Sequence, residues 1–274
     1  MISVDVAIHR VRRDITLGML LKALLVSAVF ATLIFSPPPT AKAAAIAGIV
    51  IVWIALSVTS ARSSLIARNS PALIASGQFD EAERQIDLAM RAFTLFGPAK
   101  LKALHQLAIL RHAQRRWPET AALCRALLGH RLGRSASFTK PASLILTEAL
   151  LELNELPSAY GAIMLLYGEQ LGLDEVLSLL SLQLDYEAKI GAWAKIFDAA
   201  AAKVQLAELM PSPQAARTQA VLALAALKCG REDWAQWLRG RAELLADVAT
   251  LTTDRPALAE LWSKDENKLP VVSC

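Results

Sequence analysis

The sequence predicts an all-α protein in which an N-terminal transmembrane helical hairpin precedes an α-solenoid of about five helix pairs. Three observations support this fold class. The 274 residues are 54% hydrophobic but only 6% aromatic, and their mean hydropathy of +0.38 exceeds that of an ordinary soluble domain. Ala and Leu dominate helix-length stretches over most of the chain. A turn residue recurs with a period of about 38 residues.

The distribution of charge and cysteine excludes two further classes of protein. Residues 1–70 carry seven Lys or Arg and two Asp, a net charge of +5, so the other 204 residues sum to −1. A nucleic-acid binder would carry its excess positive charge across a folded face. Here the excess flanks apolar segments, so we expect no nucleic-acid partner. The three cysteines, Cys124, Cys229 and Cys274, are too few and too scattered for a disulfide framework.

Two apolar segments near the N-terminus are long enough to cross a bilayer. Residues 17–36 contain a single charge, Lys22, in about the 20 residues that span ~30 Å of hydrocarbon. Three prolines at 37–39 end this helix. Residues 43–59 form a second, uncharged run that can lengthen toward Ala67. Because the connection is short, we expect the two spans to be antiparallel.

Basic residues near the span ends predict the orientation of the hairpin. Three of them precede the first span and two follow the second, whereas the turn has only Lys42. We therefore expect a multi-pass protein of the cytoplasmic (inner) membrane with both termini in the cytoplasm. An alternative is a signal peptide cleaved at Ala41-Lys42-Ala43, which would leave a single anchor. The basic residues outside the turn are Arg10, Arg12, Arg13, Arg62 and Arg68.

Small residues recur at four-residue spacing in both spans, where they let helix backbones approach closely. This pattern predicts packing of the two hairpin helices against each other, with homodimerisation as the alternative. The residues concerned are Ala23, Ser27, Ala31, Ala44 and Gly48.

The rest of the chain contains five copies of a degenerate repeat. Gly or Asn occupies four of the five turn positions, and both residues readily take the left-handed conformation that ends a helix. A large apolar residue usually follows two positions later, and a small residue often follows five positions later. The turn positions are Gly77, Arg115, Asn154, Gly191 and Gly230, and the apolar positions are Phe79, Trp117, Leu156 and Trp193.

This pattern resembles the tetratricopeptide repeat (TPR), an antiparallel helix pair with a Gly and an aromatic residue around its turn. The segment IASGQFDEA, residues 74–82, is the most similar to that family. The resemblance implies a TPR-like solenoid over residues 69–262, behind an anchor in 1–68 and before a polar tail in 263–274. The period exceeds the family's usual length of about 34 residues. The order of hairpin and repeats also looks like that of bacterial membrane proteins grouped with haem biosynthesis genes.

The sequence has no pattern typical of a catalytic site. It contains no Gly-rich phosphate loop, no HExxH, no GxSxG and no paired-cysteine metal site, so we expect a protein that is not an enzyme and has no cofactor. His105 and His112 share one helix face, and Cys124 follows on the partner helix. We expect a solvated or partner-contacting role for the histidines, with metal binding as the alternative.

A solenoid offers a groove lined by the first helix of each pair, into which a peptide or partner helix can be laid. The residues expected to line this groove are Lys102, His105, Gln106, Ile109, His112, Leu144, Ile145, Glu148 and Leu151.

Residues 98–140 form a basic repeat with nine Lys or Arg and one Glu. We expect it to contact anionic lipid, with an ordinary solvated face or an acidic protein segment as alternatives. Its basic surface comprises Arg111, Arg115, Arg116, Arg125, Arg131 and Arg134.

These features together predict a membrane-anchored scaffold, adaptor or assembly factor that acts through protein–protein interaction, with a membrane-associated protein partner. The alternative is an accessory structural subunit integral to a larger membrane protein complex.

Overall fold

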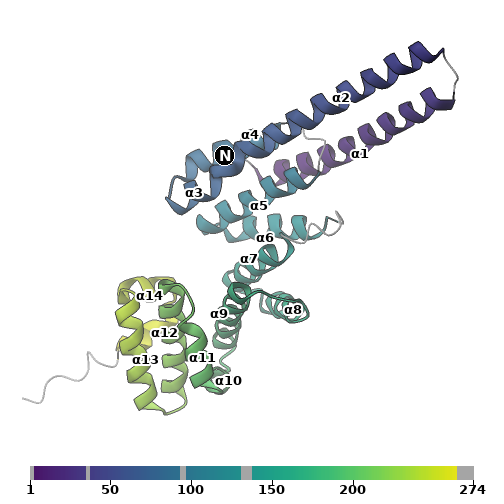
Figure 1. Cartoon of the computed structure of the whole chain (residues 1–274). Coiled ribbons are helices and arrows are strands. Elements are labelled where there is room, and N and C mark those ends of the chain that lie inside the picture. The colour runs from purple at the N-terminus through teal and green to yellow at the C-terminus, as the bar shows by residue number, and fades with distance from the viewer. Residues whose placement is uncertain (1–2, 35–37, 93–96, 131–137, 264–274) are drawn as a thin grey trace, which may run out of the picture. The chain divides into compact units, whose positions relative to one another are not determined.

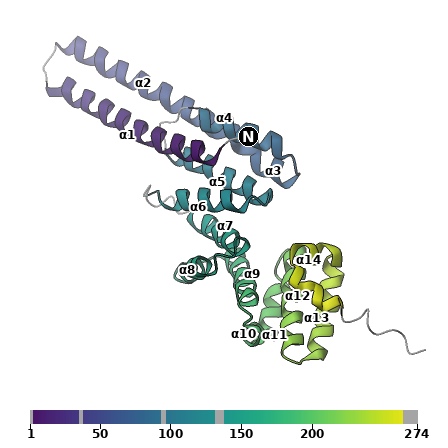
Figure 2. The ribbon, with the colours of Figure 1, turned by 180° about the vertical axis from the view of Figure 1, so that it is seen from behind.

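In a computed structural model of the chain, which describes residues 3–34, 38–92, 97–130 and 138–263, every element is a helix (Figures 1 and 2). The all-α prediction is confirmed for these residues. The chain divides into two compact units, Met1–Leu153 and Asn154–Cys274. The sequence instead predicts a boundary at residues 68 and 69, between anchor and solenoid. The predicted anchor, α1 and α2, packs against α4 and α5 in the first unit.

The first unit holds the hairpin and the helices that pack against its base. Its helices are α1 (Val4–Ile34), α2 (Pro39–Ile66), η1 (Ala67–Asn69), α3 (Ser70–Ala75), α4 (Phe79–Arg91), α5 (Gly97–Ala113), α6 (Trp117–Leu128) and α7 (Thr139–Glu152).

The second unit contains shorter helices and closes the chain. Its helices are α8 (Leu156–Tyr167), α9 (Leu173–Lys189), α10 (Trp193–Phe197), α11 (Ala200–Ala207), α12 (Ser212–Lys228), α13 (Glu232–Leu245), α14 (Val248–Asp254), η2 (Pro256–Ala259) and α15 (Glu260–Ser263).

Both hairpin helices are longer than the predicted spans. Helix α1 begins at Val4 instead of residue 17, and α2 runs to Ile66, close to the expected extension toward Ala67. Each contains a stretch long and apolar enough to cross a membrane, and only 11% and 6% of those stretches are buried in the protein. The apolar stretches therefore do not serve as core helices in the described structure.

The N-terminal half of α1 has a different role from its apolar C-terminal half. Ala7, Val11 and Asp14 are buried at helical spacing on one face, where α1 packs against α4, α5 and α6. This buried face explains why the helix starts well before the apolar run. The residues before the apolar run thus contribute to the first unit's core.

The five predicted turn positions all take a left-handed backbone conformation. Gly77, Gly191 and Gly230 have φ angles of +77°, +72° and +73°, and the non-glycine residues Arg115 and Asn154 take φ angles of +57° and +58°. At four of these turns, the residue after the turn position donates its backbone N–H to the carbonyl five residues earlier, with N···O distances of 2.8 to 2.9 Å. Such bonds satisfy carbonyls that the helix end would otherwise leave unpaired.

One predicted helix is interrupted. After the turn at Gly191, α10 lasts five residues and α11 starts at Ala200, because Ala199 takes a left-handed φ of 51°. The Lys203 ammonium donates hydrogen bonds to the carbonyls of Lys195 and Ile196, at 2.8 and 2.9 Å. It thereby replaces intrahelical partners lost at the break.

The core of the second unit runs from α9 through α12 and α13 to the C-terminal helices. Leu184, Leu222 and Leu238 are its buried centre, and Trp262 packs on its edge. The expected closing helices after residue 241 are present as α14, η2 and α15. The predicted polar tail lies outside the described residues except for Ser263.

An ion cluster ties the closing helices to the second unit. Asp185 of α9 is buried and accepts hydrogen bonds from Arg217 of α12 and from Arg255, the latter at 3.0 Å. Two arginines on one buried carboxylate hold the start of η2 against α9.

Candidate functional site

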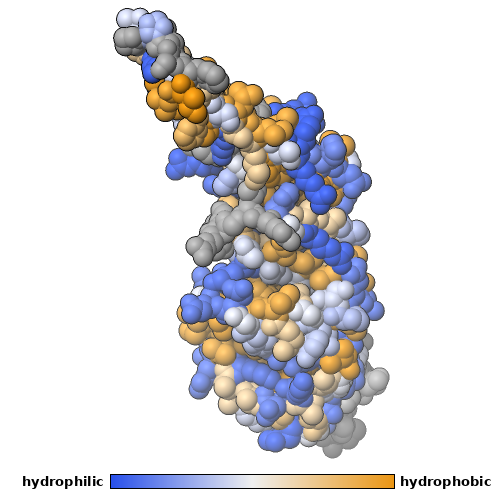
Figure 3. Space-filling model, turned by 90° about the vertical axis from the view of Figure 1, so that its right-hand side faces the viewer, coloured by the Kyte–Doolittle hydropathy of each residue, from blue (hydrophilic) through white to orange (hydrophobic). Residues whose placement is uncertain are grey.

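The outer part of the hairpin exposes a continuous apolar surface. Figure 3 shows hydrophobic side chains on the visible face of the hairpin. A soluble monomer rarely exposes so much contiguous apolar area. The exposed large side chains are Leu17, Met19, Leu20, Leu24, Val26, Phe30, Leu33 and Ile34 on α1, and Val50, Ile51, Val52, Trp53, Ile54 and Val58 on α2.

The small-residue stripes of the hairpin face outward. Ala23, Ser27 and Ala31 on α1 and Ala44 and Gly48 on α2 are all exposed, and a Cβ added to Gly48 would meet no atom within 4 Å. The expectation that these residues pack the two helices against each other is wrong. In the hairpin of the described structure they lie on its outer surface instead.

A buried ion pair joins the base of the hairpin to α5. Helices α4 to α7 of the first unit are called the helical layer below. The Asp14 carboxylate of α1 lies 2.8 Å from the Lys100 ammonium of α5, and the two side chains are 7% and 1% exposed. Lys100 also donates a hydrogen bond to the carbonyl of Met90 at the end of α4. Burial lowers the pKa of Lys100, and the hydrogen bond and charge of Asp14 oppose that shift. Sequence reasoning did not predict this pair. Its only signal in the sequence is an acidic residue just before the apolar run.

A second polar contact fixes the end of α2. Gln106 of α5 donates from Nε2 to the carbonyl oxygen of Ala67, 3.0 Å away, and the Ser70 hydroxyl donates to the same oxygen at 2.9 Å. Gln106 is buried, so its predicted place in an open groove is wrong. It joins α5 to η1, the segment that follows α2.

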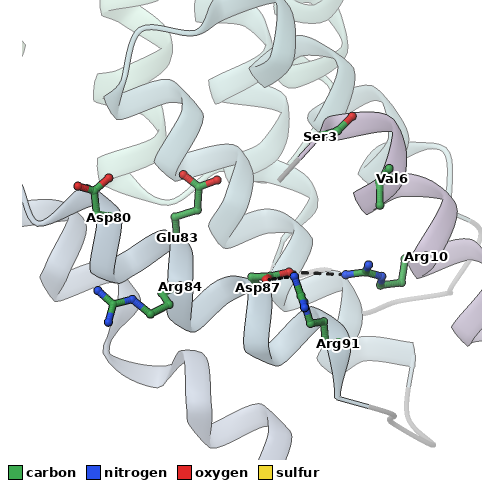
Figure 4. Close-up of a pocket in the computed structure, with 8 residues that line it drawn as sticks. All are labelled: Ser3, Val6, Arg10, Asp80, Glu83, Arg84, Asp87 and Arg91. Atoms are coloured by element: carbon green, nitrogen blue, oxygen red, sulfur yellow. Dashed lines mark ion pairs between the residues drawn. The ribbon is translucent and has the colours of Figure 1, made fainter. Parts of the chain in front are cut away.

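A polar hollow lies between the start of α1 and the outer face of α4 (Figure 4). Its volume is about 530 Å³. Asp87 pairs with Arg10 at 3.6 Å and with Arg91 at 2.7 Å. Three arginines and three carboxylates balance, so the hollow favours neither anions nor cations. It is lined by Ser3, Val6, Arg10, Asp80, Glu83, Arg84, Asp87 and Arg91.

The structure corrects the predicted basic surface at Arg111. This side chain is 0% exposed, and its guanidinium forms two hydrogen bonds with Glu83, at 2.9 and 3.2 Å, and an ion pair with Glu119 at 3.1 Å. It joins α4, α5 and the start of α6 inside the layer. A buried cation needs such partners to offset its desolvation.

The other members of the basic surface have different environments. Arg115 and Arg125 are exposed, and Arg116 is half-buried beside Glu119. Arg131 and Arg134 lie outside the described residues. The described members therefore do not form a single exposed patch, since Arg111 is buried, Arg115 lies in the turn after α5 and Arg125 lies on α6.

The structure brings together some of the expected groove residues. His112 Nε2 of α5 lies 2.9 Å from the Glu148 carboxylate of α7, and both side chains are half-buried. Ile109, Leu144 and Ile145 are half-buried as well, and Lys102 is exposed. Leu151 is fully buried, so its predicted place in the groove is wrong. The first helices of the second and third repeats do lie against each other.

The alternative of a metal site at His105, His112 and Cys124 finds no support. The His105 ring packs against Phe138 with centroids 5.5 Å apart, and His112 faces Glu148. Burial raises the pKa of Cys124 to about 12, which keeps its thiol protonated. Within the described residues, no three His, Cys, Asp or Glu side chains are grouped to hold a metal ion.

Comparison with known proteins adds no relative: no family model, no curated protein and no solved structure matches the chain.

Proposed function

We propose that this protein is a membrane-anchored scaffold, adaptor or assembly factor that holds a protein partner close to the bilayer. The observation that carries the proposal is the exposed apolar hairpin joined to a helical layer by buried polar contacts. Confinement to a membrane raises the local concentration of membrane-resident partners without any new contact. The paired helices supply a surface for binding and bring no nucleophile with its base.

The packing of α1 supports retention of the hairpin over cleavage as a signal peptide. Ala7, Val11 and Asp14 would leave with a cleaved peptide, and Lys100 would then remain buried without its carboxylate partner. The basic residues at the span ends favour cytoplasmic termini and a cytoplasmic location for the helical layer.

The proposed binding surface comprises the exposed and half-buried side chains of α5 and α7: Lys102, His105, Ile109, His112, Leu144, Ile145 and Glu148. Its test is site-specific photo-crosslinking of the full chain in native membranes. A crosslinker at Lys102 is expected to trap a discrete protein partner, whereas one at Arg84 on the outer face of α4 is not. Identical adduct patterns at both positions would reject the proposed surface.

A second candidate is a permanent accessory subunit of a larger membrane complex. The outward-facing small residues favour it, because such residues allow other transmembrane helices to approach closely. Extraction in mild detergent, followed by sizing and mass spectrometry, separates the two. A stoichiometric complex that dissociates when Ala44 and Gly48 are both changed to Leu supports the subunit; a monomer supports the adaptor.

A further inference from the structure

The end of the first unit that lies nearest the membrane is defined by contacts to α1. The start of α5 meets α1 through Lys100 and Asp14, and the end of α4 meets it through Asp87 and Arg10. The end of α6 also lies here, since α6 packs against α1 and the positive charge of Arg12 adds to burial in lowering the pKa of His130.

Two arginines on α1 stand at this level, and Arg13 also pairs with the Asp14 carboxylate at 3.5 Å. Arg12 is exposed, and the Arg13 side chain is 63% exposed. They precede the apolar run at Leu17 by four and five residues, which is about 6 to 8 Å along a helix. The headgroup layer on each side of a bilayer is about 5 to 8 Å thick. When the apolar run lies in hydrocarbon, both guanidinium groups lie among the headgroups.

The acidic groups near these arginines are already neutralised. Asp14 is buried against Lys100, and Asp87 pairs with Arg10 and Arg91. From residue 88 to residue 147 the sequence contains one acid, Glu119, and it stands at the opposite end of α6 beside Arg111 and Arg116. Arg125, exposed on α6 five residues before His130, adds a further positive charge near this end.

We propose that Arg12, Arg13 and Arg125 form a cationic collar that binds the headgroups of anionic phospholipids and holds the helical layer against the bilayer. This inference rests on the proposed membrane insertion of the hairpin. It replaces the basic repeat expected from the sequence with a different set of residues. Arg115 lies in the turn at the far end of α5 from Lys100, and this 17-residue helix is about 25 Å long, which exceeds the Debye length of about 8 Å at physiological salt.

The test uses the full chain purified in mild detergent, with native mass spectrometry to count retained phosphatidylglycerol and phosphatidylcholine. Arg12→Gln/Arg13→Gln is compared with Arg84→Gln/Arg115→Gln, which removes the same charge from exposed positions in the middle of α4 and in the turn after α5. At about 1 kcal/mol per basic residue, the collar variant is expected to lose about 30-fold in preference for phosphatidylglycerol. The control is expected to lose less than about two-fold.

Two further variants guard against loss of folding. Arg12→Lys/Arg13→Lys keeps the charge and is expected to keep the lipid preference, and Arg125→Gln added to the Gln pair is expected to lower it further. Equal losses in the collar and control variants, or no loss in either, would overturn the proposal. Membrane insertion of the hairpin is tested separately, by extracting membranes with alkaline carbonate. Release of the chain would reject membrane insertion, whatever the lipid preference of the purified protein.

Discussion

The Asp14 carboxylate and the Lys100 ammonium, 86 residues apart in sequence, meet at 2.8 Å inside the protein. One group belongs to α1, the first helix of the apolar hairpin, and the other to the first turn of α5. Their contact makes the anchor and the helical layer one structural unit. A flexible tether would let the layer drift, whereas this junction sets its orientation relative to the hairpin.

Breaking this pair from one side should destabilise the first unit. Lys100→Met leaves Asp14 buried without a cation and is expected to cost about 3 kcal/mol or more of unfolding free energy. Asp14→Leu/Lys100→Met removes both charges and should recover most of that loss. Chemical denaturation in detergent measures both. A double variant no more stable than the single one would show that the charge pair is not the cause.

Arg111 should behave as a core residue although the sequence suggests a surface one. Arg111→Met removes the buried cation that pairs with both Glu83 and Glu119, and we expect it to cost about 3 kcal/mol or more. Arg111→Lys should restore only part, because an ammonium cannot form the two-pronged contact with Glu83. Arg115→Met, at an exposed position four residues away, serves as the control and should change stability by less than about 0.5 kcal/mol.

The left-handed turns predict opposite effects at matched positions. Gly77→Ala is expected to destabilise by about 1 kcal/mol, since an L-residue with a side chain disfavours this φ. Arg115→Gly relieves the same strain and is expected to stabilise by about 0.5 to 1 kcal/mol. Thermal unfolding of the two variants checks this. Changes of the same sign would contradict the role of these positions.

His105 should make stability depend on pH. Burial lowers its pKa from 6.5 in the folded protein, so below that pH the unfolded chain binds more protons than the folded one. Stability should therefore fall as the pH drops through 6.5 and below. His105→Gln should lose less stability than the wild type between about pH 7.5 and about pH 5. Parallel pH profiles for the two proteins would count against this assignment.

The orientation of the hairpin can be tested with single cysteines in a chain whose own three are replaced. Lys42→Cys, at the start of α2 beside the connection between the two hairpin helices, should react with a membrane-impermeant maleimide added to intact cells. Asp80→Cys, on the exposed face of α4, should react only after the membrane is opened. Labelling of both in intact cells, or the reverse pattern, would contradict cytoplasmic termini.

The elements that the sequence predicts well depend on local chemistry. The two apolar runs, the prolines between them and the five turn positions each carry their signal within a few residues, and the structure has helices and left-handed turns where these signals place them. The break between α10 and α11 is less visible. Ala199 is a residue that normally continues a helix, and the ammonium of Lys203 donates to the carbonyls of Lys195 and Ile196 before the break.

The surface residues were predicted less well because burial depends on distant partners. Arg111 looks exposed until Glu83, 28 residues earlier, is placed beside it. Gln106 is buried where it donates a hydrogen bond to the carbonyl of Ala67, 39 residues earlier in the chain. Leu151 is buried where α7 packs against its neighbours. None of these partners stands at a helical spacing from the residue it buries.

The order of residues along the chain thus determines that it is helical, where its apolar hairpin lies and where its paired helices turn, because backbone conformation and hydrophobicity act over short stretches. Which charges face water and which are enclosed follows from long-range packing alone. The free-energy cost of desolvating a charged group is offset only when a group of opposite charge on another helix lies beside it. That contact exists only in the folded chain.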